Sequence, residues 1–242
     1  MSDRLRGMLA LDLAKVDLRK GVVGLIAIAI AIIFIAVFGT AGMAAGIAAL
    51  FVIVADTPGA RTRDRLVSVL VLGIAGALVT LVAVWAGVEH VWVSTLLTFG
   101  VVFAGTVAAG FGRGYAVRGL LLSLWAVIAL SLAGAGDSAV ELAGAYLLGG
   151  VVATVVLVVQ SHVSPAPPIE PEAGRAPVAF GDLLRSRIGG FALLRAAAVG
   201  LATALGIELY PDHPIWPAIT VLLVLRPRAG EALSIGVLRT LG

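Results

Sequence analysis

Long apolar runs separated by short polar segments make up most of the chain. Runs long enough to cross a membrane, about 17–25 residues for a hydrocarbon core of about 30 Å, occupy six stretches: 21–38, 66–88, 91–111, 116–134, 140–159 and 191–209. Two further apolar runs, 42–55 and 214–225, are shorter. The pattern predicts an all-α, polytopic bundle of transmembrane helices with about eight crossings, if both short runs cross. The last residues, 231–242, are typical of the start of a ninth segment that stops abruptly.

The basic residues fall on one side of this predicted topology. With the crossings counted from a cytoplasmic amino terminus, all 17 Lys and Arg residues, Arg195 among them, belong to segments on the inner side. Cytoplasmic loops carry an excess of Lys and Arg, so the amino terminus is predicted to be cytoplasmic. Both short runs must then cross, because omitting either would place every later loop on the opposite side of the membrane. The opposite loops carry no Lys or Arg, and their ionisable residues are Glu89, His90, Asp137, Glu141, Glu208, Asp212 and His213.

Composition narrows the classes of function. Hydrophobic residues make up 60% of the chain and charged residues 13%, and the mean hydropathy is +1.10, far from the values of a soluble domain. Cysteine is absent, and the three histidines lie far apart in the sequence. Neither a nucleophile-elbow serine nor a phosphate-binding lysine loop is present, so we expect no enzyme, metal site or cofactor. The scattered basic residues argue against nucleic acid and suit the anionic headgroups of an inner leaflet.

The chain divides into four predicted regions. Residues 1–20 have the pattern of an amphipathic helix lying on the cytoplasmic leaflet, with a solvated tail as the alternative. Residues 21–160 form a first six-helix unit, and residues 161–180 form a proline-rich cytoplasmic linker. Residues 181–242 begin a second unit with the same layout of a basic stretch, a full crossing and a short crossing. Transporter halves related by an axis along the membrane normal have such parallel repeats.

The short run near the end of the chain is interrupted by prolines. Proline disfavours the α conformation in the residue before it, which affects His213, Trp216 and Arg226. The longest unbroken helix is therefore Pro217–Leu225, roughly 13 Å long and less than half of the hydrocarbon core. Polar backbone at membrane depth is tolerated where protein or a wet cavity satisfies it. The segment is predicted to face the bundle interior; the alternative is a peripheral kinked helix whose arginines reach the headgroups.

The sequence HPIWPAITVLLVLRPRAG at 213–230, followed by RTLG at 239–242, resembles the signature of the fusaric-acid-resistance and aromatic acid exporter family of inner-membrane proteins. The resemblance implies two six-helix halves, a cytoplasmic portion, and export of organic, often aromatic, acids driven by the proton gradient. Here the second half stops after two crossings, which predicts a truncated repeat. The matching residues are Pro214, Trp216, Thr220, Pro227, Gly230, Arg239, Thr240 and Gly242.

The predicted substrate site follows from the short segment and the resemblance together. Short or broken segments in corresponding positions of two halves indicate a transporter's substrate site. We expect Trp216, Pro217 and Thr220 to line the pathway near the junction of the two repeats. Arg226 or Arg239 would attract the carboxylate of an organic anion. An arginine that only reaches the lipid headgroups is the alternative for both.

Other polar residues have weaker or structural interpretations. Asp212 and His213, at the outer mouth of the short segment, are the candidates for proton coupling, with plain loop polarity as the alternative. Glu141 is predicted to close a helix-capping box with Ser138. The runner-up function is a membrane scaffold or assembly component, or a fragment of a transporter. A homo-oligomer would supply the half that the chain lacks.

Overall fold

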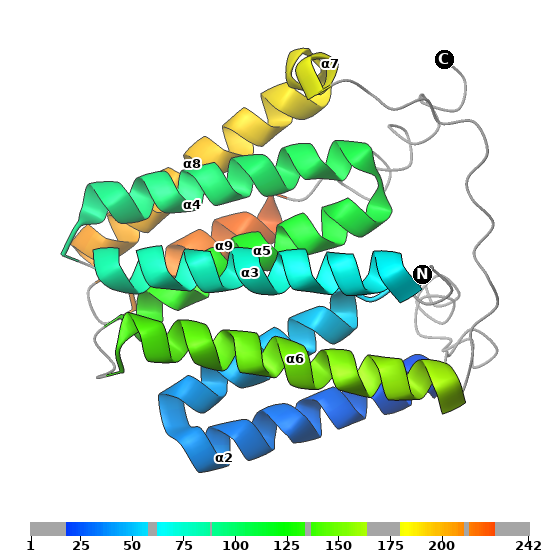
Figure 1. Cartoon of the computed structure of the whole chain (residues 1–242). Helices are drawn as coiled ribbons and strands as arrows, with labels where there is room; N and C mark the ends of the chain where they lie inside the picture. Colours follow the sequence, from blue (N-terminus) through cyan, green and yellow to red (C-terminus); the bar gives the residue numbers. More distant parts are fainter. Residues whose placement is uncertain are drawn as a thin grey trace, which may run out of the picture.

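The computed structural model describes residues 18–57, 62–87, 89–133, 137–163, 180–210 and 213–225. Within these ranges every regular element is a helix. The long helices lie side by side and alternate in direction along the chain (Figure 1). The prediction of an all-α bundle is confirmed for this part of the chain. The elements are α2 (Leu18–Ala55), α3 (Thr62–Ala86), α4 (Val91–Ala108), the 3₁₀ turn η2 (Ala109–Phe111), α5 (Arg113–Leu132), α6 (Ala139–Val163), α7 (Phe180–Arg185), α8 (Arg187–Leu209) and α9 (Trp216–Val224).

Six of the helices are long and apolar enough to cross a membrane. Helices satisfy their backbone polar groups internally, which a lipid environment demands. These are the features of a multi-pass membrane protein. The number six differs from the eight crossings predicted, because it counts both halves of α2 as one span and leaves out the nine-residue α9. The six spans are Gly24–Ala55, Arg63–Ala86, Val91–Phe111, Gly114–Leu132, Ala139–His162 and Arg187–Leu209.

Helix α2 reverses its direction at Gly39. The backbone there has φ 58° and ψ −127°, a conformation that only glycine adopts without strain. The chain doubles back at this point, so that residues 18–38 and 40–55 form two antiparallel arms (Figure 1). The arms approach closely: a Cβ atom on Gly42 would collide with the carbonyl oxygen of Phe34. The predicted short run is therefore a separate helical arm.

The second arm of α2 lies in the main core of the bundle. Small residues of this arm, such as Ala44 and Ala48, are fully buried and pack with α6, α3 and α5. Trp125 of α5 and Tyr146 of α6 lie in the same cluster, with ring centroids 4.5 Å apart. Small residues let helix backbones approach closely, as membrane helices require when lipid tails are equally apolar. The first arm keeps most of its apolar side chains exposed, as a lipid-facing helix would.

A second apolar cluster joins α8 and α9 to α4 and α5. Its fully buried members include Val102, Val127, Val199 and Leu222. Helices α4 and α8 share one of the most extensive interfaces in the bundle. This cluster positions α9, the short helix that the sequence singled out.

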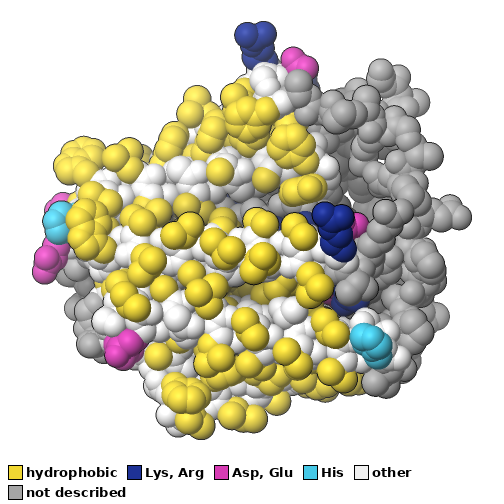
Figure 2. Space-filling model, in the orientation of Figure 1, with side chains coloured by type: hydrophobic (Ala, Val, Ile, Leu, Met, Phe, Trp, Pro, Cys, Tyr) yellow, Lys and Arg dark blue, Asp and Glu magenta, His cyan; other side chains and the backbone are white. Residues whose placement is uncertain are grey.

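Charged side chains gather at the two ends of the bundle. Figure 2 shows apolar side chains across the middle, with Lys and Arg at one end and most Asp, Glu and His at the other. We call the end where α3, α5 and α8 begin the basic end, and the end where α4, α6 and α9 begin the acidic end. Asp56, Asp64, Asp182 and His162 are the described exceptions that lie at the basic end.

Three predicted boundaries need correction or lie outside the described ranges. Helix α6 continues to Val163, so the first residues of the predicted 161–180 linker are helical. Ser161 fits within the helix because its hydroxyl donates to the carbonyl of Val158 in the preceding turn. Residues 1–17 of the predicted amphipathic helix, the linker from 164 to 179, and the ninth segment at 231–242 lie outside the described residues.

The predicted capping box at the start of α6 is confirmed. The backbone N–H of Ser138 donates to Oε2 of Glu141 at 2.8 Å, and the backbone N–H of Glu141 donates to the Ser138 hydroxyl at 3.2 Å. Both bonds satisfy donors that a helix start leaves without partners.

Candidate functional site

Helix α9 is a short rod with proline in its first turn. It covers nine residues, Trp216–Val224, and is roughly 13 Å long. A turn at His213–Ile215 leads into it, with the backbone N–H of Trp216 donating to the carbonyl of His213 at 3.3 Å. The helix ends at Leu225, whose φ of −77° and ψ of 59° are not helical. The predicted helix Pro217–Leu225 is thus confirmed to within one residue at each end.

Helix α9 packs against α8 with one face only. Ala218 and Leu222, one helical turn apart, are fully buried. Near the acidic end, Gly206 of α8 makes room for the segment that leads into α9, because a Cβ atom there would collide with the carbonyl oxygen of Pro214. Trp216 and Thr220 lie on the exposed face, where Trp216 is 60% exposed.

Arg195 of α8 binds the end of α9 inside the bundle. Its side chain is only 6% exposed, and Nη2 donates to the carbonyl oxygen of Leu222 at 2.9 Å. That carbonyl belongs to the last turn of α9, where helical carbonyls have no partner within the helix. The guanidinium also neutralises the negative end of the α9 helix dipole. The buried guanidinium of Arg195 therefore caps the C-terminal end of the nine-residue helix α9.

The arginine lies well inside the span. Eight residues separate it from the start of α8 at Arg187, which is roughly 12 Å along the helix axis. On insertion scales an arginine near the centre of a membrane helix costs about 2.5–3.5 kcal/mol, so its partners have to offset a substantial penalty. Ionisable residues at such depth commonly mark substrate or ion pathways.

Hydroxyl groups of α4 and α8 form a buried polar seam that leads to Arg195. Thr106 of α4 accepts a long contact of 3.4 Å from Nη1 of Arg195 and donates to the carbonyl of Val102 at 2.7 Å. Three other buried hydroxyls of α4 and α8 donate to backbone carbonyls, whereas the buried hydroxyl of Thr95, beside Gly200 of α8, has no hydrogen-bond partner among the described residues. The three that donate belong to Ser94 (2.6 Å to Gly87), Thr98 (3.0 Å to Ser94) and Thr203 (2.9 Å to Val199).

The predicted site residues are brought together only in part. Trp216, Pro217 and Thr220 all belong to α9, and the exposed His213 precedes it. The Thr220 hydroxyl donates to the carbonyl of Trp216 at 2.9 Å, so it is satisfied within the helix. Trp216 and Thr220 share one face, opposite to Leu222, to which Arg195 binds. Asp212, Arg226 and Arg239 lie outside the described residues.

Arg195 is the site residue that the sequence interpretation missed. Counting it with the inner-side charges was wrong, because it lies buried within the bundle rather than at the basic end. Its depth could have revealed it: Arg195 stands well inside an apolar run, and the small residues Ala192 and Ala196 flank it on the buried face of α8. An arginine in that setting needs a polar partner from another helix.

The four tryptophans have different environments. Trp125 is fully buried, and its indole N–H donates to the carbonyl of Gly76 at 3.1 Å and to the Thr80 hydroxyl at 2.9 Å. Trp85 and Trp92 lie exposed near the acidic end, as expected of tryptophans at a membrane interface. Only Trp216 lies on the short helix.

Comparisons with known proteins leave the resemblance as a prediction. The chain matches no protein-family model, and neither curated proteins nor solved structures gave a significant match. Within the described ranges, no three His, Cys, Asp or Glu side chains are grouped as a metal site would require. The geometry around α9 is therefore the basis for a functional proposal.

Proposed function

We propose that the chain is a multi-pass protein of the bacterial inner membrane that exports organic acids, aromatic acids among them, along a pathway beside α9. The supporting observation is the buried Arg195 bound to the carbonyl of Leu222 at the end of a nine-residue helix. A discontinuous helix with a charged partner at depth is typical of transporter substrate sites. Coupling to the proton gradient, through Asp212 and His213, is part of the same proposal.

The proposed orientation has the basic end in the cytoplasm. Cytoplasmic loops are enriched in Lys and Arg, and the described arginines at helix starts, among them Arg65, Arg118 and Arg187, all lie at the basic end. Counting the two arms of α2 separately would give seven crossings, and the eighth would require α9 together with residues that follow it. Helix α9 would enter from the outside and end within the hydrocarbon layer.

The chemistry of the proposed site is recognition of a carboxylate by a guanidinium. Arginine presents planar N–H donors that match the two oxygens of a carboxylate. We infer that the carboxylate of the substrate competes with the Leu222 carbonyl for Arg195 when α9 shifts. The exposed ring of Trp216 would supply a stacking surface for an aromatic acid. Arg226 or Arg239 would attract the anion at the inner side.

An efflux assay tests this proposal. Cells that express the chain are loaded with a panel of aromatic acids, and the rate of loss is compared with cells that carry an empty vector. We expect Arg195→Gln and Trp216→Ala to slow efflux at least tenfold and at least threefold, respectively. Arg187→Gln, at an exposed arginine of the same helix, is the matched control and should retain the rate.

Membrane levels of each variant are compared by immunoblot, so that loss of protein is not mistaken for loss of function. Arg195→Lys keeps the charge but not the planar fork, and we expect it to recover only part of the rate. Efflux equal to wild type in both Arg195→Gln and Trp216→Ala would refute the assignment to α9. Equal efflux with and without the chain would refute transport itself.

A non-transporting assembly component is the second candidate function. The exposed face of α9 favours it, because Trp216, Leu223 and Val224 present apolar surface that another chain could cover. The chain has no cysteine, so Val224→Cys gives a single site for crosslinking in native membranes. Crosslinked dimers in cells without measurable efflux would favour this function over export.

A further inference from the structure

A hollow at the basic end, whose described lining includes no residue of α9, has the lining of an anion site. It lies where α2 ends and α3 and α5 begin, and it is lined by Asp56, Thr57, Arg65, Ser68, Val69 and Arg118. A second hollow adjoins it through Asp56 and Arg65 and extends toward Thr154 and Ser161 of α6. The lining thus combines two guanidinium groups, one carboxylate and apolar side chains. We call the pair of hollows the basic-end cleft.

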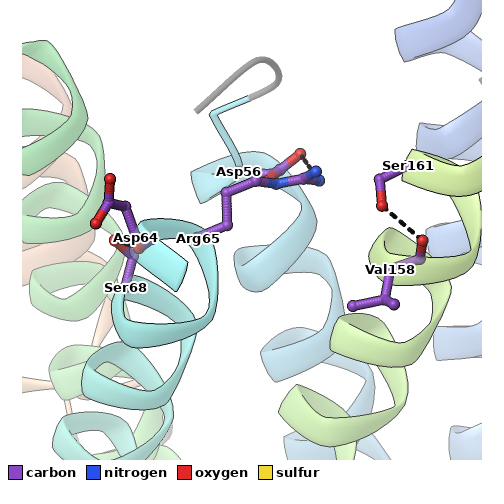
Figure 3. A network of polar contacts seen from close by, with 6 residues as sticks. All are labelled: Asp56, Asp64, Arg65, Ser68, Val158 and Ser161. Atoms are coloured by element: carbon purple, nitrogen blue, oxygen red, sulfur yellow. Dashed lines mark hydrogen bonds and ion pairs between the residues drawn. The ribbon is translucent and has the colours of Figure 1, made fainter. Parts of the chain in front are cut away.

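Arg65 is neutralised within the cleft. Its Nε donates to Oδ1 of Asp56 at 2.8 Å and its Nη2 donates to Oδ2 at 2.9 Å, so both carboxylate oxygens are engaged (Figure 3). The pair is largely buried, with 15% of the Arg65 side chain and 7% of the Asp56 side chain exposed. Asp64, the next acid, points away from this pair in Figure 3.

Arg118 is left with a surplus charge. Its Nε atom is buried and has no hydrogen-bond partner among the residues that the structure describes. Its guanidinium carbon lies 5.7 Å from the centre of the Tyr115 ring, a contact that orients the group without neutralising it. Two arginines and one aspartate leave the described lining with one net positive charge. A buried guanidinium N–H without an acceptor favours an anion with an oxygen to accept it.

We propose that the basic-end cleft binds one oxyanion group, a carboxylate or a phosphate, through Arg118. Arg65, neutralised by Asp56, would contribute only the N–H donors that the carboxylate leaves unused. Val69 and Leu72 line the same hollow, so the anionic group would belong to a molecule with an apolar part. An anionic lipid headgroup and a dissolved organic acid both offer this chemistry at the inner surface. The export proposal is not required for this site.

Binding to the purified full chain tests the proposal in two arms. In the first arm, protein is exchanged into nanodiscs of phosphatidylglycerol and phosphatidylcholine, and the phosphatidylglycerol retained after detergent washing is measured by native mass spectrometry. In the second, protein in phosphatidylcholine nanodiscs is dialysed against radiolabelled benzoate. Saturable binding that Arg118→Gln weakens identifies a lipid source in the first arm and a dissolved acid in the second.

Three variants assign the binding to the cleft. We expect Arg118→Gln to weaken binding at least tenfold in the arm that saturates, and Arg118→Lys to weaken it about threefold, because the ammonium lacks the planar fork. Arg187→Gln, the exposed control at the same end, should bind as wild type does.

Three outcomes would overturn the proposal. The first is that ligand binding to the wild type does not saturate in either arm. The second is that wild type and Arg118→Gln bind equally well. The third is that Arg187→Gln loses as much binding as Arg118→Gln does. If Arg118→Gln loses its helical circular dichroism, the test passes to Arg118→Lys, and unchanged binding there would overturn the proposal. The assay involves no transport, so its result is independent of the efflux experiment.

Discussion

The two short segments of this protein share a layout but end in different surroundings. The arm at residues 40–55 and helix α9 each fold back on the helix before them, and a glycine allows the close approach in each case: Gly42 beside Phe34, and Gly206 beside Pro214. Each also ends at an arginine of a neighbouring helix. Arg65 binds Asp56, just after the arm, and Arg195 binds the carbonyl of Leu222 in α9.

The difference lies in what each arginine binds and how deep it lies. The arm reaches the basic end, where a carboxylate and a guanidinium form a bidentate pair beside the aqueous surface. Helix α9 stops within the bundle, where the partners of the arginine include the carbonyl of Leu222 and the hydroxyl of Thr106. A segment that reaches the surface needs only an ion pair, whereas one that stops at depth needs a buried cation. The latter is the arrangement on which a substrate anion could act.

The largest effect on stability is expected at the close approach within α2. In Gly42→Ala, the new Cβ would meet the backbone of Phe34, which cannot move aside as a flexible side chain could. Overpacking of this kind costs about 3 kcal/mol. SDS-induced unfolding in micelles, followed by circular dichroism, measures the change. Gly144→Ala is the control, since a Cβ atom there meets nothing within 4 Å; an equal loss in both variants would contradict the tight hairpin.

The next effect concerns the buried arginine. Arg195→Gln shortens the side chain and removes a charge-assisted bond to Leu222, which should lower the free energy of unfolding by about 2 kcal/mol. The same unfolding assay measures it, with Arg187→Gln expected to change little. If Arg195→Gln were as stable as the wild type, the guanidinium of Arg195 would not stabilise the C-terminal end of α9.

The ion pair after the 40–55 arm should contribute less. A double-mutant cycle with Asp56→Asn and Arg65→Gln should give a coupling energy of about 1 kcal/mol, because the pair is bidentate yet close to water. The coupling should shrink in high salt, while the cost of Arg195→Gln should not, since a buried bond is screened much less. If salt changed the coupling energy and the cost of Arg195→Gln equally, the two arginines would not differ in their exposure to water.

The smallest effect is expected on the exposed face of α9. Thr220→Val removes a hydroxyl whose bond stays within the helix, so the free energy of unfolding should change by less than about 0.5 kcal/mol. Leu222→Ala, on the buried face, is the contrasting variant and should cost at least about 2 kcal/mol. A large loss in Thr220→Val would show that another chain or segment covers this face.

Much of the fold could be predicted from the sequence because apolar runs and prolines act locally. The run 91–111 matches a span at Val91–Phe111, and the proline spacing gave α9 to within one residue at each end. The count of crossings was harder to predict. The reversal at Gly39 depends on a backbone conformation, and hydropathy alone does not distinguish a hairpin from one long helix.

The site was predicted less completely than the fold, because its key contact is between distant residues. Proline rules select α9, but they do not indicate which side chain binds its end. Arg195 and Leu222 lie 27 positions apart, and only the antiparallel packing of α8 and α9 brings them together. The net pattern of charges concealed Arg195, since its sign agreed with the expected inner side. Arg118 was also counted only as an inner-side charge, and its place in the basic-end cleft depends on helices that converge from separate parts of the chain.

The depth at which α9 ends is the central claim, and a spin label measures it directly. Because the chain lacks cysteine, Leu225→Cys and Thr57→Cys can each carry one label in lipid vesicles. Collision rates with oxygen and with a water-soluble nickel complex give the depth of each label. The account predicts that the label after α9 lies roughly 10 Å deeper than the label after the 40–55 arm, as the position of Arg195 along α8 requires. Equal depths, with both labels among the headgroups, would contradict it.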